Sequence, residues 1–234
     1  MKFLPIFGPA TILASALAAI ALMSSTSALA TTVVLDTGHT PRRPGSISPS
    51  GNPEYLYNLN VTNVIAARLQ LRGIKVIRIA ADGNEIALND RTAGTDHAEL
   101  FLSIHHDSIQ QAWIDAGRRR EFTGYAVFVS LKNPAYEKST RCGRTIGQAL
   151  LQAGEHPSLY HALPIKGENR PLVDRAAGLH RFDDLVVLKT ARSPAVLVEV
   201  GVIANPDEEG RLREAGTVQK LGTAIADAAV ACLQ

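Results

Sequence analysis

Short apolar runs alternate with stretches of helical periodicity along residues 31–234. Five such runs predict β-strands: residues 32–35, 74–79, 100–105, 124–130 and 195–200. Apolar positions three or four residues apart predict helices over residues 55–72, 134–153 and 206–232. Because strands and helices alternate, the pattern predicts a single-domain α/β fold in which a mostly parallel, twisted β-sheet is sandwiched between α-helices.

The longest stretch without an assigned element covers residues 154–185 and is rich in Gly, Pro and charged residues. We predict a surface loop there, at the rim of a site. His156, His161 and His180 lie in this stretch, but their spacing indicates no particular role.

The first thirty residues are typical of a secretory signal peptide. Lys2 precedes an apolar stretch over residues 3–23, and Ala28-Leu29-Ala30 forms an A-x-A cleavage pattern. An uncleaved membrane anchor is the alternative, but Gly8 and Pro9 interrupt the stretch and favour cleavage. We therefore predict a mature chain of residues 31–234 that is periplasmic or secreted and is not bound to the membrane.

Composition excludes several classes of protein. The 24 Lys and Arg residues nearly balance the 22 Asp and Glu residues, so no strong field attracts nucleic acid. With 46% hydrophobic residues the chain has enough apolar surface to form a core, which excludes disorder. Its two cysteines are too few for a disulfide scaffold. Cys142 and Cys232 fall in predicted helices, and the sequence leaves open whether they pair.

Polar residues gather where the predicted strands end. Asp36 and His39 follow the first strand, His105 ends the third, and Glu199 lies within the apolar run of the last. In open α/β sheets, ligands bind beyond the carboxyl ends of the strands. An ionised carboxylate among aliphatic neighbours is costly unless it is paired, so Glu199 needs a partner. A salt bridge to Arg91 or Arg192 is the simple structural alternative to a catalytic role.

Two histidines at strand ends, together with carboxylates, indicate a metal. Catalytic zinc commonly takes two His and one Glu and leaves a fourth position for water. His39 and His105 supply the imidazoles, and Glu54 fits as the third ligand because it opens the helix after the first loop. The spacing matches no short metal motif, so an ordinary structural role for these residues stays open.

Four sequence blocks, in this order, resemble those of the zinc-dependent N-acetylmuramoyl-L-alanine amidases, the Amidase_3 family. D-T-G-H-T at residues 36–40 resembles D-x-G-H-G, and Glu54 precedes an Asn-Leu pair at residues 58–59. S-I-H-H-D at residues 103–107 resembles S-I-H-A-N. The longest block, P-A-V-L-V-E-V-G-V-I-A-N at residues 194–205, resembles P-A-V-L-V-E-x-G-F-I-S-N. Together the blocks span nearly all of the predicted mature chain.

The resemblance implies a role for each matching residue. His39, Glu54 and His105 would bind Zn²⁺, and Glu199 would be the catalytic carboxylate that takes a proton from the attacking water. The remaining residues to which the resemblance draws attention are candidates for supporting a ligand or contacting substrate: Asp36, Arg91 and His106. Asp36 is expected to orient one of the metal-binding residues without binding the metal itself. Ordinary ion pairs are the alternative for Asp36 and Arg91.

Two departures from the family pattern affect these expectations. Thr40 replaces the second Gly of the first block and is followed by P-R-R-P at residues 41–44. This predicts a stiffer first loop that contacts substrate in its own way. His106 and Asp107 replace Ala and Asn, and because strand side chains alternate, only one of His105 and His106 faces the metal. The motif selects His105, with His106 as the alternative.

The resemblance therefore implies a peptidoglycan hydrolase that cleaves the amide between N-acetylmuramic acid and the L-alanine of the stem peptide. No wall-binding module is evident, so affinity for peptidoglycan or muropeptides must come from the cleft or from a recruiting or activating protein. Another zinc exopeptidase or amidohydrolase, or a non-catalytic wall-binding protein, would share the fold. Retention of Glu199 argues against the binding protein, which has no use for a buried carboxylate there.

Overall fold

A seven-stranded sheet forms the centre of the computed structural model, which describes residues 1–3 and 31–234. The strand order is β2-β1-β3-β7-β4-β6-β5. The strands are β1 (Thr32–Thr37), β2 (Lys75–Ile79), β3 (Leu100–Asp107), β4 (Ala126–Val129), β5 (Leu172–Asp174), β6 (Leu179–Arg181) and β7 (Ala195–Val202). β4 pairs antiparallel with β7, and β5 with β6, while the other pairings are parallel. The predicted α/β class and mostly parallel sheet are confirmed.

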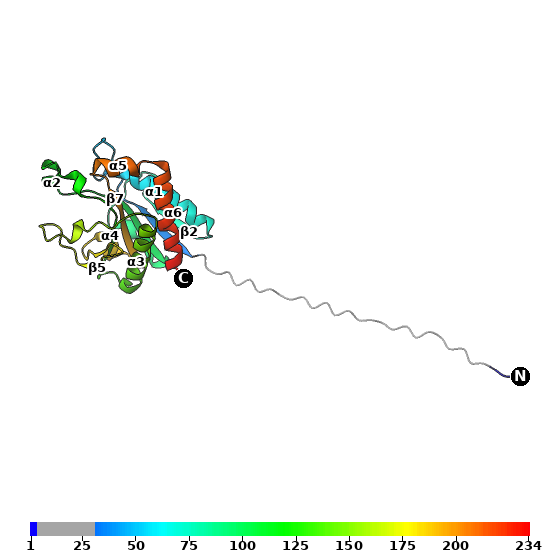
Figure 1. Cartoon of the computed structure of the whole chain (residues 1–234). Coiled ribbons are helices and arrows are strands. Elements are labelled where there is room, and N and C mark those ends of the chain that lie inside the picture. The colour runs from blue at the N-terminus through cyan, green and yellow to red at the C-terminus, as the bar shows by residue number, and fades with distance from the viewer. Residues whose placement is uncertain (4–30) are drawn as a thin grey trace.

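Three long helices cover one face of this sheet: α1 (Glu54–Leu71), α3 (Tyr136–Gln152) and α6 (Ala215–Cys232). α6 packs against both α1 and α3 (Figure 1). The larger core lies between these helices and the sheet, where Ile65, Ile146 and Ile225 are fully buried beside Leu102 and Val198. Burial of apolar side chains on this face therefore supplies most of the hydrophobic stabilisation.

The opposite face carries a much thinner layer. Phe101, Phe128 and Leu197 from the strands pack against Val187 and Leu188 of the five-residue helix α4 (Val186–Thr190). The rest of the layer consists of loops and the short turns η1 (Asp90–Thr92) and η2 (Thr95–His97). Because no long helix covers this face in the described residues, the carboxyl ends of its strands are left accessible.

The predicted helix over residues 206–232 is in fact two helices, α5 (Pro206–Leu212) and α6. Glu214 has extended backbone angles between them. The Asn205 side chain accepts hydrogen bonds from the backbone N–H groups of Asp207 and Glu208 and so caps α5. The prediction of one continuous helix was therefore wrong. The helical spacing of apolar residues continues across Glu214 because both helices bury apolar side chains.

Residues 154–185 contain more structure than the predicted loop. Besides η4 (Tyr160–Ala162) they supply β5 and β6, which extend the sheet beyond β4. Each strand has only three residues, too few for hydrophobic alternation to be recognised in the sequence. Two further short elements, α2 (Gln111–Asp115) and η3 (Arg119–Glu121), connect β3 to β4.

The predicted signal peptide lies outside the described residues, apart from its first three. Within the part of the chain that the structure describes, no helix is both long and apolar enough to cross a membrane.

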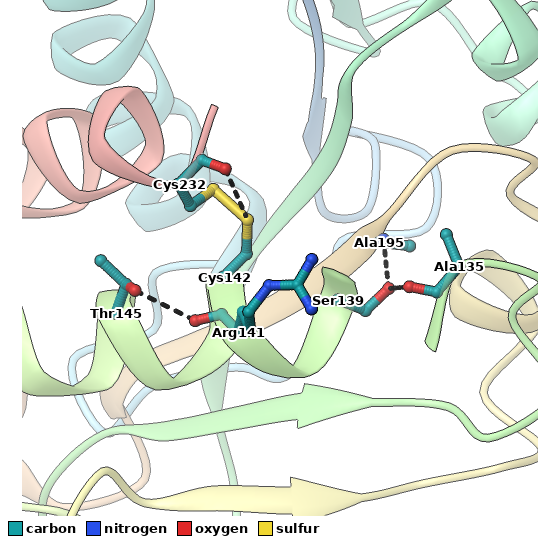
Figure 2. The surroundings of a disulfide bond; sticks show 7 residues. All are labelled: Ala135, Ser139, Arg141, Cys142, Thr145, Ala195 and Cys232. Atoms are coloured by element: carbon teal, nitrogen blue, oxygen red, sulfur yellow. Dashed lines mark hydrogen bonds between the residues drawn. A yellow bond between two sulfur atoms is a disulfide. The ribbon is translucent and has the colours of Figure 1, made fainter. Parts of the chain in front are cut away.

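A disulfide joins Cys142 of α3 to Cys232 at the end of α6, with their Cα atoms 5.1 Å apart (Figure 2). The pairing that the sequence left open is therefore present. Nearby, Ser139 of α3 accepts a hydrogen bond from the backbone N–H of Ala195, the first residue of β7. The cross-link thus lies at the amino end of β7, away from the carboxyl ends of the parallel strands.

The disulfide joins residues 90 positions apart, so it restricts the unfolded chain strongly. We expect replacement of both Cys142 and Cys232 by Ser to lower the free energy of unfolding by about 2–4 kcal/mol. Urea denaturation checks this, with the reduced wild-type chain as the control. Equal stability of the oxidised wild type and the double variant would contradict it.

Candidate functional site

Asp36, His105 and Glu199 lie on the thinly covered face of the sheet. In the parallel register Asp36 is opposite Ser103, and His105 is opposite Glu199. Ser103 and His105 are two residues apart on β3, so their side chains point to the same face. Strand register alone therefore brings three residues predicted from the sequence to one place.

Glu54 reaches this place from the first turn of α1, where a carboxylate interacts favourably with the helix dipole. The loop before the helix caps it, because the carbonyls of Ser46 and Pro44 accept the N–H groups of Glu54 and Tyr55. The backbone N–H of Ser46 in turn donates to Glu54 Oε2 over 3.1 Å. The start of the helix and its carboxylate are thus fixed by one loop.

The Glu54 carboxylate bridges the two histidines that the sequence singled out. His39 Nε2 lies 3.1 Å from Oε2, and His105 Nδ1 lies 3.0 Å from Oε1. Burial by itself raises the pKa of Glu54, but hydrogen bonds and charge from His105 and His39 hold it well below its ordinary value. Ligand atoms from these three residues lie within 4.8 Å of one another. Two imidazoles and one carboxylate are a common donor set for catalytic zinc, so the chemistry of these residues fits the ion.

Close backbone approach is needed to form this cluster. A Cβ on Gly38 would lie 2.6 Å from the His105 ring, and one on Gly45 would lie 2.6 Å from the ring of His39. His39 itself has φ of 69°, a left-handed conformation that is unusual for a residue other than glycine. The predicted ligand is therefore held in a strained backbone that the surroundings must maintain.

Arg91 maintains that backbone. Its Nη2 donates to the carbonyl of His39 over 2.8 Å, and its Nη1 donates to the carbonyl of Thr37 over 2.9 Å. Asp36 holds Arg91 through a 2.7 Å ion pair and also accepts from Ser103 Oγ. The two residues form an ion pair, as one alternative predicted. Asp36 supports the His39 loop through Arg91, and among the described residues no hydrogen bond joins Asp36 to His39, Glu54 or His105.

His106 faces α1, away from the cluster. Its Nδ1 lies 2.8 Å from Asn58 Oδ1, and the amide of Asn58 donates to the carbonyl of Gly38 and to Glu54 Oε1. Since Asn58 Oδ1 accepts, His106 Nδ1 carries the proton. Burial lowers the pKa of His106 to about 3, so the ring is neutral. The alternative that made His106 the metal ligand is not supported, because strand alternation turns it to the other face.

Glu199 is partly buried, and its buried Oε2 atom has no hydrogen-bond partner among the described residues. Burial and the nearby charges of Asp107 and Glu54 raise its pKa well above its ordinary value. Neither predicted structural partner binds it: Arg91 is occupied by Asp36, and no ion pair with Arg192 is present in the described part of the chain. A buried carboxylate oxygen left without a partner is costly and indicates a functional group.

Sequence reasoning missed one residue beside Glu199. His161, from η4, donates to Asp107 over 2.7 Å and to Glu168 over 2.8 Å. Burial alone would lower the pKa of His161, but these carboxylates raise it to about 10, so the ring is a cation. It anchors residues 154–185 to the end of β3. No spacing signal could have found it, because the three residues meet only in the fold.

A cavity of about 460 Å³ contains the exposed side of this cluster. Its lining combines the polar side chains of His39, His105 and Glu199 with apolar ones that include Phe128 and Phe182. Two imidazole nitrogens, one carboxylate oxygen and a second, unpaired carboxylate in a cleft are typical of a mononuclear hydrolytic metal centre on an α/β fold.

Comparison with known proteins gives a more specific result. Residues 33–231 match the family model of the N-acetylmuramoyl-L-alanine amidases, Amidase_3. The chain therefore belongs to this family, which confirms the resemblance of the four sequence blocks.

Individual relatives agree with the family match. N-acetylmuramoyl-L-alanine amidase AmiA of Escherichia coli is 27% identical over 215 residues, which cover 85% of this chain and 74% of AmiA. The solved structure of Ami1 from Mycobacterium smegmatis has a TM-score of 0.71 at 21% identity and covers 87% of this chain and 96% of that one. The CwlD amidase of Clostridioides difficile, solved in complex with the GerS lipoprotein, has a TM-score of 0.65 at 20% identity, with 87% and 98% coverage.

Asn58 offers a test of the support behind the cluster. Replacing Asn58 by Ala removes donors from Glu54 and Gly38 and leaves His106 unpaired, so we expect Zn²⁺ affinity to fall about 10- to 100-fold. Competition with a chromophoric chelator measures this. Asn133→Ala, which removes an equally buried amide that binds carbonyls near α4, is the control and should keep wild-type affinity. Equal zinc affinities of Asn58→Ala and the wild type would show that Asn58 does not support the metal donors.

Proposed function

We propose that this protein is a zinc-dependent peptidoglycan amidase, in which His39, Glu54 and His105 bind the metal. The substrate is the amide between the lactyl group of N-acetylmuramic acid and the L-alanine of the stem peptide. Family membership and the name of the relative AmiA support the substrate class. The observation that carries the mechanism is the buried, unpaired carboxylate oxygen of Glu199, which lines the same cavity as His39 and His105.

The donor set supports zinc. His39 and His105 now contact Glu54 directly, at distances that place protons between the three side chains. Binding of a cation by these residues would displace those protons. When bound, zinc supplies a Lewis acid that polarises the scissile carbonyl and lowers the pKa of water.

Glu199 performs the proton transfers in this proposal. Burial raises the pKa of Glu199, and a cation held by the three donors would lower it and favour the carboxylate. That carboxylate takes a proton from the attacking water as the water oxygen bonds to the lactyl carbonyl carbon. The same carboxyl group then donates that proton to the nitrogen of L-alanine as the C–N bond breaks, which returns Glu199 to its starting state. The position of Glu199 opposite His105 in the sheet register keeps it beside the metal donors throughout.

Arg91 and Asp36 act on the backbone in this scheme. By holding the carbonyls of Thr37 and His39, Arg91 fixes the strained loop that presents the His39 ring. His161 lines the cavity and is held in place by ion pairs with Asp107 and Glu168. These contacts keep the donors and the general base at fixed positions, which is how a preorganised site lowers the barrier.

The disulfide supports a location outside the cytoplasm, because such bonds persist in oxidising compartments. We therefore propose that residues 1–30 are a cleaved signal peptide and that the enzyme acts in the periplasm or as a secreted protein. The CwlD amidase was solved with a lipoprotein partner, which supports a similar recruiting or activating protein here.

Variants at Glu199 and His39 separate metal binding from chemistry. We expect Glu199→Gln to keep bound zinc but to lower kcat about 10²- to 10⁴-fold, because it removes the proton acceptor. His39→Ala should lose both zinc and turnover. Metal analysis of the purified proteins and assay on muropeptides measure the two effects.

Glu155→Gln is the matched control for these variants. Glu155 is a buried glutamate that is paired with Arg211 and Lys220, and it does not line the cavity. It should retain zinc and near-normal turnover. Normal hydrolysis by Glu199→Gln would show that another group is the general base.

The bond that is cut is identified by mass spectrometry of purified peptidoglycan treated with residues 31–234. We expect free stem peptides beginning with L-alanine, together with peptide-free glycan, and loss of both products with a chelator. Release of other fragments would indicate a different hydrolase. No release by the folded, zinc-loaded chain, alone or with a wall extract that could contain a partner, would contradict the proposed activity.

A further inference from the structure

Arg43 lies at the edge of the cavity in the first loop, where the sequence departs from the family pattern. The backbone N–H of Thr40 donates to the carbonyl of Arg43, and the reverse bond also forms, each over 3.1 Å. His39 precedes this turn, and the loop continues to Gly45, which lies against the His39 ring and the Glu54 carboxylate. The backbone of Arg43 is therefore fixed close to the proposed zinc ligands.

The guanidinium of Arg43 is anchored on one edge only. Its Nε forms an ion pair with Glu85 Oε1 at 3.0 Å, and Thr40 Oγ1 donates to Glu85 Oε2 over 2.6 Å. Nη1 and Nη2 make no hydrogen bond within the described residues, and the side chain is 73% exposed. An arginine held through Nε keeps its other edge, with two parallel N–H groups, free for a planar anion.

The other cationic groups that line the cavity are already paired, and Arg91 is buried. Arg91 uses its terminal nitrogens on Asp36 and on backbone carbonyls. Both ring nitrogens of His161 are bound to carboxylates. Among the described lining residues, Arg43 is thus the cation able to form two new hydrogen bonds with an acidic group that enters the cleft.

We propose that Arg43 binds a free carboxylate of the stem peptide and makes the enzyme selective for acidic over amidated stems. This inference rests on the proposed function, because it places the muramyl amide at the metal donors. A carboxylate accepts two parallel bonds from Nη1 and Nη2, whereas a carboxamide offers one acceptor oxygen and turns an N–H donor toward the cation. Glu85 keeps the guanidinium oriented and so positions Arg43.

The test compares muramyl peptides that differ only in whether one stem carboxyl group is free or amidated. Binding is measured by calorimetry on zinc-loaded Glu199→Gln protein, so that no turnover is required. The free acid at one position should bind about 10- to 100-fold more tightly than the amide, the usual range for hydrogen bonds to charged groups. Adding Arg43→Gln should reduce this ratio to near one.

Arg42→Gln is the matched control, because Arg42 is the adjacent exposed arginine, has no hydrogen bond in the described residues and does not line the cavity. It should preserve the ratio between acid and amide. Arg43→Lys, which keeps the charge but loses the fork of donors, should give an intermediate ratio.

An unchanged ratio in Arg43→Gln at every stem position, or a ratio near one in the Glu199→Gln parent, would overturn the inference. Turnover by the wild type, measured on the same peptides, tests the proposed function separately. Hydrolysis without acid selectivity would contradict only the role of Arg43. Selective binding without hydrolysis of any of the peptides would contradict only the proposed amidase activity.

Discussion

The buried carboxylate of Glu54 is the constraint on which the rest of the site depends. It receives one imidazole on each oxygen and further donors from Ser46, Asn58 and the backbone of His106. Burying a charged group requires that nearly all of its hydrogen-bonding capacity is used. Three features bring these donors around one carboxylate. They are the close backbone approach at Gly38 and Gly45, the strained backbone of His39, and the hydrogen bonds of Arg91 to the carbonyls of Thr37 and His39.

Uneven coverage of the sheet explains how one small domain combines a stable core with an accessible cleft. Long helices bury one face, while the five-residue helix α4 and loops cover the other. The residues of the site come from strands whose inner neighbours are fully buried, so the donors rest on a rigid base. Loops with differing chemistry then form the rim, as is common in α/β proteins.

Much of this arrangement was predictable from the sequence. The strands that carry Asp36, His105 and Glu199 are apolar runs long enough to recognise, and their alternation and order place these residues together. The family motifs then selected Glu54 and chose His105 over His106. The prediction worked where local pattern and sheet register point to the same arrangement.

Other features depend on contacts that have no local signal. The indirect action of Asp36 through Arg91, the cation at His161 and the pairing of Cys142 with Cys232 each join residues more than 50 positions apart. The break before α6 was hidden because apolar periodicity continues on both sides of it. Strands β5 and β6 form only because β4 offers a hydrogen-bonding edge, a tertiary effect that outweighs weak intrinsic preference.

The location of the disulfide has a consequence for how this protein can change over evolutionary time. The cross-link lies at the amino end of β7, whereas the rim loops meet at the opposite end of the strands. Substitutions in distant parts of a structure affect stability nearly independently. Rim residues that do not hold the donors, such as Arg43, are therefore free to vary with the chemistry of the substrate, while the far end preserves the folded state.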